Sequence, residues 1–163
     1  MDNVIVFGNS GSGKSTYAKV LVDQGFAHLD LDTLAWDMTP DPVRRPLSKS
    51  LAEINTFIKT HRKWVIEGCY ADLIENIMSD DSELVFMNLS VEQCIENAKN
   101  RPWESHKYES KEQQDQNLKM LIDYIIDYPN RDNWFSLSEH TRIYTIFKGP
   151  KKMITENDEA FNG

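Results

Sequence analysis

Apolar residues recur along the chain in two alternating patterns. Short runs rich in β-branched and aromatic residues are typical of buried strands, and apolar residues three and four positions apart are typical of helices that bury one face. The short runs fall at five places, so we predict five strands, at residues 4–7, 26–32, 64–67, 83–89 and 142–147.

Segments with helical spacing separate these runs. We expect helices near residues 14–24, 50–61, 73–78, 91–101, 118–126 and 133–140, with one or two helical turns after Lys151. Ser50 with Glu53, and Ser90 with Gln93, have the spacing of capping boxes. Regular alternation of strands and helices predicts an α/β fold, a doubly wound, mostly parallel sheet with helices on both faces.

Composition fits one ordinary domain over residues 1–163. The chain is 40% hydrophobic and 27% charged, with a net charge of −8, which disfavours nucleic acid or an anionic membrane as a general partner. Cys69 and Cys94 lack metal-ligand spacing. No leader pattern and no apolar run of roughly 20 residues is present. We expect a cytoplasmic protein, monomeric or homodimeric.

One motif dominates the chain. Residues 8–16 have the pattern G-x-x-x-x-G-K-[ST] between a predicted strand and a predicted helix, which is the context of a phosphate-binding P-loop. Its backbone N–H groups would surround phosphates at a helix N-terminus. We expect Lys14 to reach the β- and γ-phosphates, Ser15 to ligate Mg²⁺, and Thr16 to support the loop or the α-phosphate. The predicted nucleotide contacts are Gly8, Asn9, Ser10, Gly11, Ser12, Gly13, Lys14, Ser15 and Thr16.

Acidic residues end two of the predicted strands. Asp30 and Asp32 lie two residues apart, so on a strand they share a face, where they would hold a metal-bound water or orient a substrate hydroxyl. A capped turn, with Asp32 as N-cap, is the alternative. Glu67 precedes Gly68, and we expect it to support Mg²⁺ beside the P-loop; a surface glutamate is the alternative. His28 is interpreted as structural.

Basic and aromatic residues provide the remaining candidates. Arg101 begins a polar segment, residues 102–114, that fits a lid, and its guanidinium would stabilise a transferring phosphoryl group; a solvated helix end is the alternative. Lys107 and Lys111 would assist. Residues 33–62 form the predicted acceptor-binding segment, irregular between 33 and 47. Further expected acceptor contacts are Trp36, Arg44, Tyr70 and Arg131. A solvated turn is the alternative for Arg44, and core packing is the alternative for Trp36 and Tyr70.

Three blocks of sequence, at 8–16, 28–36 and 64–72, resemble the adenylate-kinase-related proteins called FlaR-like or DNA topology modulation proteins. That group is similar to nucleoside monophosphate, shikimate and gluconate kinases. The resemblance implies a P-loop three-layer sandwich with a five-stranded parallel sheet of order 2-3-1-4-5.

The same resemblance implies roles for single residues. Asp30-Leu31-Asp32 resembles the D-x-D of shikimate kinases, where the first acid assists Mg²⁺ and the second orients the acceptor hydroxyl. Arg101-Pro102 is similar to the pair that opens their lid. Lys148 and Gly149 fall where such kinases pack backbone against adenine. After Glu67-Gly68 comes Cys69-Tyr70, without the arginine that holds a monophosphate in adenylate kinases, and the glycine-rich acceptor loop of shikimate kinases is missing.

The motifs together favour a small kinase that moves the γ-phosphate of ATP·Mg²⁺ to a small acceptor, which is a nucleotide, a sugar acid or a shikimate-like hydroxyl. Lys14, Asp32 and Arg101 are the predicted catalytic residues, and Ser15, Asp30 and Glu67 the predicted metal ligands. One alternative is an ATP-binding regulator with slow hydrolysis. A DNA-stimulated ATPase is the other, and the net charge of −8 disfavours it.

Overall fold

The computed structural model describes residues 1–37 and 39–157. Five parallel strands form one sheet of order β2-β5-β1-β6-β7. They are β1 (Asn3–Gly8), β2 (Ala27–Asp30), β5 (Trp64–Gly68), β6 (Glu83–Met87) and β7 (Lys151–Ile154). Counted along the chain within this sheet, the order is 2-3-1-4-5, as expected. The predicted α/β class is therefore confirmed, and the detail that differs is which residues form the fifth strand.

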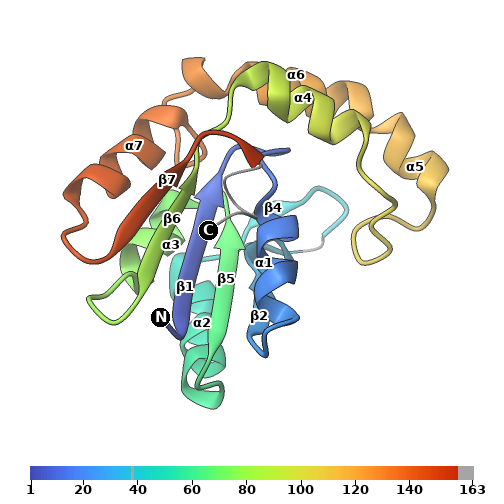
Figure 1. Ribbon diagram of the computed structural model, residues 1–163. Coiled ribbons are helices and arrows are strands. Elements are labelled where there is room, and N and C mark those ends of the chain that lie inside the picture. The colour runs from blue at the N-terminus through green and yellow to red at the C-terminus, as the bar shows by residue number, and fades with distance from the viewer. Residues whose placement is uncertain (38, 158–163) are drawn as a thin grey trace.

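Helices cover both faces of the sheet and give the domain three layers (Figure 1). Successive residues of β1 point to opposite faces, which is why one strand serves two apolar cores. Ile5 and Phe7 face α2 (Leu47–Thr60), α3 (Ala71–Ile77) and α7 (Leu137–Ile146). Val4 and Val6 face α1 (Lys14–Val22), α4 (Val91–Lys99) and α6 (Leu118–Ile126).

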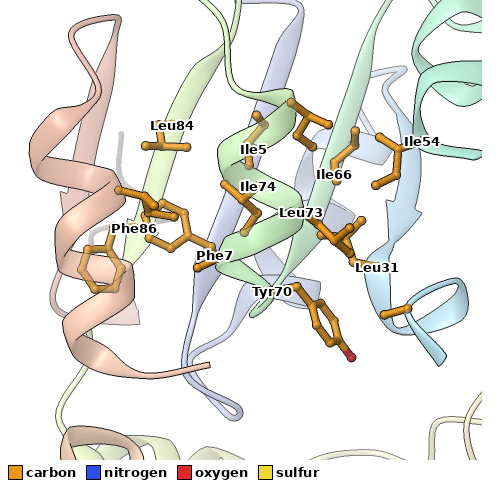
Figure 2. Packing of buried hydrophobic residues seen from close by; sticks show 14 of the residues in the cluster. Ile5, Phe7, Leu31, Ile54, Ile66, Tyr70, Leu73, Ile74, Leu84 and Phe86 are labelled. Carbon is orange, nitrogen blue, oxygen red and sulfur yellow. The ribbon is translucent and has the colours of Figure 1, made fainter. Parts of the chain in front are cut away.

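Aromatic stacking fixes the first of these cores. The rings of Phe7 and Phe86, on neighbouring strands, lie 4.8 Å apart and almost parallel. Figure 2 shows the adjoining residues, with Ile74 of α3 near the centre of the cluster and Tyr70 at its lower rim. A rigid core directly beneath the strand ends holds those ends in a constant relation to one another.

Shorter elements complete the chain. They are η1 (Leu31–Thr33) and η2 (Tyr128–Asn130), both 3₁₀ helices, α5 (Lys111–Gln116), and a two-stranded antiparallel sheet of β3 (Trp36–Asp37) and β4 (Val43–Arg44). This hairpin lies within residues 33–47, where an irregular segment was predicted. Pairing of Trp36 with Arg44 gives the segment regular structure instead.

The predicted fifth strand at residues 142–147 is wrong. Residues 137–146 form α7, whose N-terminus is capped because Ser136 Oγ accepts a hydrogen bond from Glu139 N, and Ile143 is buried in the core. The real fifth strand is β7, in the tail where helical turns were predicted. Only its last residue, Ile154, is buried, so its sequence lacks the apolar run that marks the inner strands.

The two predicted capping boxes have different outcomes. Ser90 is the N-cap of α4, with its side chain accepting from Gln93 N at 3.2 Å, as predicted. The cap at Ser50 is wrong because α2 begins at Leu47, directly after Pro46. Ser50 lies inside the helix, and its hydroxyl donates to the carbonyl of Leu34. Among the described residues, no helix is long and apolar enough to cross a bilayer.

Candidate active site

Strands β1, β2 and β5 end at the same edge of the sheet, and a cavity of about 680 Å³ lies there. A space of this size accommodates small-molecule ligands. Ten of the predicted site residues line it: Ser10, Gly11, Gly13, Lys14, Ser15, Thr16, Asp30, Asp32, Glu67 and Arg101. Residues from four separate segments thus meet around one space.

The loop between β1 and α1 passes very close to α4. Gly11 has φ +77°, and a Cβ at this position would lie 2.3 Å from the carbonyl oxygen of Cys94. Gly13, the N-cap of α1, has φ +94°, and its Cβ would lie 2.6 Å from the side chain of Asn157. Backbone conformation therefore favours glycine at both positions, and at Gly11 the backbone of α4 also leaves no space for a side chain.

Lys14 lies over this loop. Its ammonium donates to the carbonyls of Asn9 at 2.7 Å and Gly8 at 3.2 Å. Among the residues that the structure describes, no side chain caps the N-terminus of α1, so the free N–H groups of its first turn and the lysine charge both favour an anion. The loop therefore has the donors and the local positive potential that a phosphate requires.

An amide network that sequence reasoning missed supports the outer side of the loop. Asn97 Nδ2 donates to the carbonyl of Gly11 and to Asn157 Oδ1, both at 2.8 Å, and Asn157 Nδ2 donates to the carbonyl of Ser12 at 3.1 Å. Asn157 comes three residues after β7, so the misplaced fifth strand concealed it. Placing that strand at 151–154 would have brought Asn157 to the P-loop edge.

Glu67 connects β5 to the P-loop. Its Oε1 accepts a hydrogen bond from Ser15 Oγ at 3.1 Å, whereas its Oε2 has no hydrogen-bond partner among the described residues. The residue is 2% exposed and pairs in register with Asp30 on β2. Burial, reinforced by the charge of Asp30 and opposed by that of Lys14, raises the pKa of Glu67 to about 7.

These groups fit a magnesium ion. Within residues 1–37 and 39–157, no three His, Cys, Asp or Glu side chains form a metal site by themselves. Mg²⁺ typically takes one or two protein ligands and completes its shell with water and substrate phosphates. The Ser15 hydroxyl, the unpaired Glu67 oxygen and the neighbouring Asp30 carboxylate provide that kind of incomplete oxygen set.

The two aspartates predicted on one strand face lie on different elements. β2 ends at Asp30, whose Oδ1 accepts from the N–H of Asp32, and Asp32 belongs to the 3₁₀ turn η1. The turn nevertheless brings both carboxylates to one cation. Lys107 Nζ lies 2.9 Å from Asp32 Oδ2 and 3.5 Å from Asp30 Oδ2.

Asp32 is held in its charged form. Partial removal from water would raise its pKa, but the charge of Lys107 and hydrogen bonds from Tyr70 and Lys107 outweigh that effect, so the pKa lies below its ordinary value. Tyr70 Oη donates to Oδ1, and Trp36 Nε1 in turn donates to Tyr70 Oη at 2.9 Å. A carboxylate that stays charged at neutral pH is able to accept a proton from a hydroxyl.

The predicted lid, residues 102–114, also contributes charged side chains to the cavity, in addition to Arg101 just before it. Glu104 Oε1 lies 3.1 Å from Arg101 Nε, and Glu104 Oε2 lies 3.3 Å from Lys107 Nζ. His106 Nε2 lies 3.6 Å from Asp30 Oδ2. Figure 1 shows this loop at the end of α4, to one side of the sheet. Lys111, in contrast, pairs with Asp115 on an exposed helix face and does not line the cavity.

Arg44, Trp36 and Tyr70 do not line the described cavity. The Arg44 guanidinium binds both carboxylate oxygens of Asp72, at 3.0 and 3.3 Å, and lies 4.9–5.7 Å from the rings of Trp36, Tyr70 and Phe135. In this structure Arg44 fastens the β3–β4 hairpin to α3. Trp36 and Tyr70 reach the site only through the hydrogen bonds that lead to Asp32.

Arg131 is likewise engaged outside the cavity. Its guanidinium donates to the carbonyls of Tyr124 at 2.8 Å and Phe135 at 3.1 Å, and it lies 3.8 Å from the centre of the Tyr124 ring. Two main-chain oxygens and a stacked ring anchor the chain after α6. The predicted contact of Arg131 with an acceptor stays a prediction.

Lys148 and Gly149 lie at the wrong edge of the sheet for the predicted adenine contact. They precede β7, which runs parallel to β6 with Lys151 opposite Leu84. The amino ends of these strands are remote from the P-loop, which follows the carboxyl end of β1. The error follows from the misplaced fifth strand, because residues after a strand and residues before it lie at opposite edges of a parallel sheet.

Three of the nine predicted loop residues support the loop without lining the cavity. They are Gly8, Asn9 and Ser12. Asn9 donates to the carbonyl of Ile125 at 3.3 Å, and Ser12 is completely buried.

His28, interpreted from sequence as structural, places Nε2 3.9 Å from Glu67 Oε1, so it adds to the polar surroundings of that carboxyl group.

Comparisons with known proteins agree with this architecture. No protein-family model and no curated protein matches the sequence. A solved structure of deoxyadenosine kinase from M. mycoides with bound dATP has a TM-score of 0.55 at 13% identity, with 97% of this chain and 94% of that chain covered. Shikimate kinase from Acinetobacter baumannii in complex with shikimate has a TM-score of 0.51 at 14% identity, with 99% of this chain and 89% of that chain covered. The chain therefore has a P-loop kinase-like fold.

The raised pKa of Glu67 predicts a pH-dependent difference in stability. Because the folded pKa of about 7 exceeds the ordinary value of 4.5, Glu67 stabilises the folded state most below pH 4.5, and this contribution is lost as pH rises through 7. Glu67→Gln, which removes the buried charge, should therefore raise the free energy of unfolding at pH 8 by at most roughly 3 kcal/mol and change it little at pH 5. Urea denaturation at both pH values measures this.

The matched control is Glu83→Gln, on a strand glutamate at the opposite edge of the sheet that is 27% exposed. It should show no such difference between the two pH values. Equal pH dependence in both variants, or a Glu67→Gln variant that is less stable at pH 8 than the parent protein, would contradict the assignment.

The contact between Gly11 and α4 gives a second prediction. Gly11→Ala should lower the free energy of unfolding by roughly 3 kcal/mol or more, because the substitution combines a left-handed backbone with a severe clash. Gly25→Ala is the control, since Gly25 has φ +97° with no atom within 4 Å of the added Cβ. It should lose only the conformational part, about 1–2 kcal/mol. Equal losses of unfolding free energy in the two variants would contradict the prediction, because they would mean that α4 shifts at little cost to make room for the added methyl group.

Proposed function

We propose that the protein is an ATP-dependent phosphotransferase that moves the γ-phosphoryl group to the hydroxyl of a small acceptor. One observation carries the proposal. A single cavity is lined by the P-loop lysine, by two carboxylates from another strand end and by an arginine at the start of the lid segment. Phosphoryl transfer depends mainly on positioning and on stabilisation of charge, and these are the residue types that provide both.

Each residue then has a role in this proposal. Lys14 and Arg101 would stabilise the charge on the transferring group. Asp32 would accept the proton of the acceptor hydroxyl. The hydroxyl oxygen of the acceptor would form a bond to the γ-phosphorus, and the bond from the γ-phosphorus to the β–γ bridging oxygen would break, which releases ADP. Ser15 and Glu67, with Asp30 beside them, would hold Mg²⁺, which neutralises charge on phosphate oxygens.

We also propose that the chain belongs to the FlaR-like group. Support comes from the positions of the three blocks that carry the resemblance. They contain the P-loop, the end of β2 with η1, and the end of β5 with the start of α3. Each block therefore contributes residues to the cavity or to the hydrogen bonds around it.

The acceptor is proposed to be uncharged at its reacting end. Arg44 and Arg131, the two arginines predicted to contact the acceptor, are bound to Asp72 and to main-chain carbonyls. The acceptor side of the cavity instead contains Asp30, Asp32 and Glu104 around Lys107. Such an arrangement favours a neutral hydroxyl compound over a monophosphate or carboxylate.

Nucleotide binding is tested first. Lys14→Ala should leave the thermal midpoint nearly unchanged and weaken binding of ATP·Mg²⁺ by roughly 10–100-fold, because a charge-assisted hydrogen bond to phosphate contributes about 1.5–3 kcal/mol. Isothermal titration calorimetry measures the affinity. Lys111→Ala is the matched control and should bind like the parent protein. Unchanged affinity in Lys14→Ala would remove the P-loop assignment.

Transfer is tested separately. Asp32→Asn should keep ATP affinity within about threefold and lower acceptor-dependent turnover by roughly 10²–10⁴-fold, the usual contribution of a general base. A coupled assay with nucleosides, sugars, sugar acids, shikimate and nucleoside monophosphates measures it, and neutral acceptors should react fastest. If no acceptor accelerates turnover over basal hydrolysis, the ATP-binding regulator is the better assignment. Stimulation by DNA that falls steeply with salt would favour the DNA-dependent ATPase.

A further inference from the structure

Tyr70 has an unusual position between the apolar core and the cavity. The residue is 3% exposed, and its ring packs edge-on against that of Phe135, with 5.3 Å between the ring centres. Figure 2 shows the ring at the lower rim of the apolar cluster, with its hydroxyl oxygen directed away from the cluster. Because the ring is confined in this way, the direction in which the hydroxyl points is fixed by packing.

The hydrogen bonds on either side of this hydroxyl have defined directions. An indole N–H only donates and an ionised carboxylate only accepts. The N–H of Trp36 therefore occupies a lone pair of Tyr70 Oη, and the single hydroxyl proton of Tyr70 is directed to Asp32 Oδ1. The second carboxylate oxygen, Oδ2, accepts a hydrogen bond at 2.9 Å from Lys107, which lines the cavity together with Asp32.

We propose that Trp36 and Tyr70 are positioning residues that act through Asp32. Their two hydrogen bonds form a relay that fixes the plane of the carboxylate and occupies Oδ1, so that Oδ2 alone receives the acceptor hydroxyl. The relay rests on the proposed role of Asp32. It also accounts for two residues that were predicted to wall the acceptor pocket but lie behind it.

The surroundings of the relay support its direction. Burial, together with the nearby Cys69 and Asp32, raises the pKa of the Tyr70 hydroxyl, so it remains a donor at any physiological pH. Arg44 packs against both aromatic rings and holds Asp72, which keeps Trp36 and Tyr70 in place.

The test uses variants that keep the rings and remove only the donors. Tyr70→Phe deletes the hydroxyl, and Trp36→Phe deletes the N–H while leaving an aromatic ring beside Arg44. Tyr144→Phe is the matched control, because Tyr144 packs on Phe86 at 5.9 Å and does not line the cavity. All three variants are examined as the full chain, with thermal unfolding to verify the fold.

Two measurements separate positioning from packing. Turnover with the best acceptor should fall roughly tenfold or more in Tyr70→Phe and by a smaller factor in Trp36→Phe, with the KM for ATP·Mg²⁺ unchanged. Carboxyl ¹³C NMR, with the Asp32 signal assigned by its loss in Asp32→Asn, should show a higher pKa for Asp32 in both variants. Tyr144→Phe should match the parent protein in both measurements.

Several results would overturn the relay. One is an unchanged Asp32 titration in Tyr70→Phe. Another is an effect of Trp36→Phe no larger than that of Tyr144→Phe. The NMR titration requires no turnover, so it tests the relay even if no acceptor is found. Absence of transfer by the parent protein contradicts the proposed function, whereas an unshifted titration contradicts the relay alone.

Discussion

The close approach of the P-loop to α4 determines how the rest of the site is arranged. Gly11 lies so near the carbonyl of Cys94 that no side chain fits between them. α4 also supplies Asn97, which donates to the carbonyl of Gly11, and it ends directly before Arg101 and the lid segment. One contact therefore fixes both the shape of the phosphate loop and the point from which the lid residues extend.

Parallel pairing provides the second constraint, which is electrostatic. Because β2 and β5 pair in register, Asp30 and Glu67 lie side by side at the strand ends. Two buried carboxyl groups side by side are unfavourable in their charged forms unless cations or protons compensate the charge. Lys14 from the loop and Lys107 from the lid segment lower the pKa of Glu67, but burial and Asp30 dominate, so its pKa stays near 7. The framework therefore leaves a deficit of positive charge between Asp30 and Glu67, where Mg²⁺ is proposed to bind.

Local signals in the sequence predict the framework well and the periphery poorly. The strand order was implied by the family resemblance. The P-loop and the acids at the ends of β2 and β5 follow from motif spacing and short apolar runs. The fifth strand does not, because residues 142–147 are β-branched and aromatic yet form a capped helix with Ile143 in the core, while β7 contains exposed lysines. Asn157 was missed as a site residue for a related reason, since no motif marks it and it reaches the P-loop only because β7 precedes it.

The same distinction bears on how an acceptor is recognised. Arg44 is the type of residue expected to bind an anion, but its guanidinium is paired with Asp72 and packed against three aromatic rings. Removing it from that pair to meet a ligand would leave Asp72 without its ion-pair partner and loosen the hairpin that carries Trp36. Lys107 lines the cavity itself, beside Asp30, Asp32 and Glu104, so a ligand that enters the cavity meets its charge without any movement of the hairpin. A charge that takes part in recognition is therefore expected on the lid segment rather than on the hairpin.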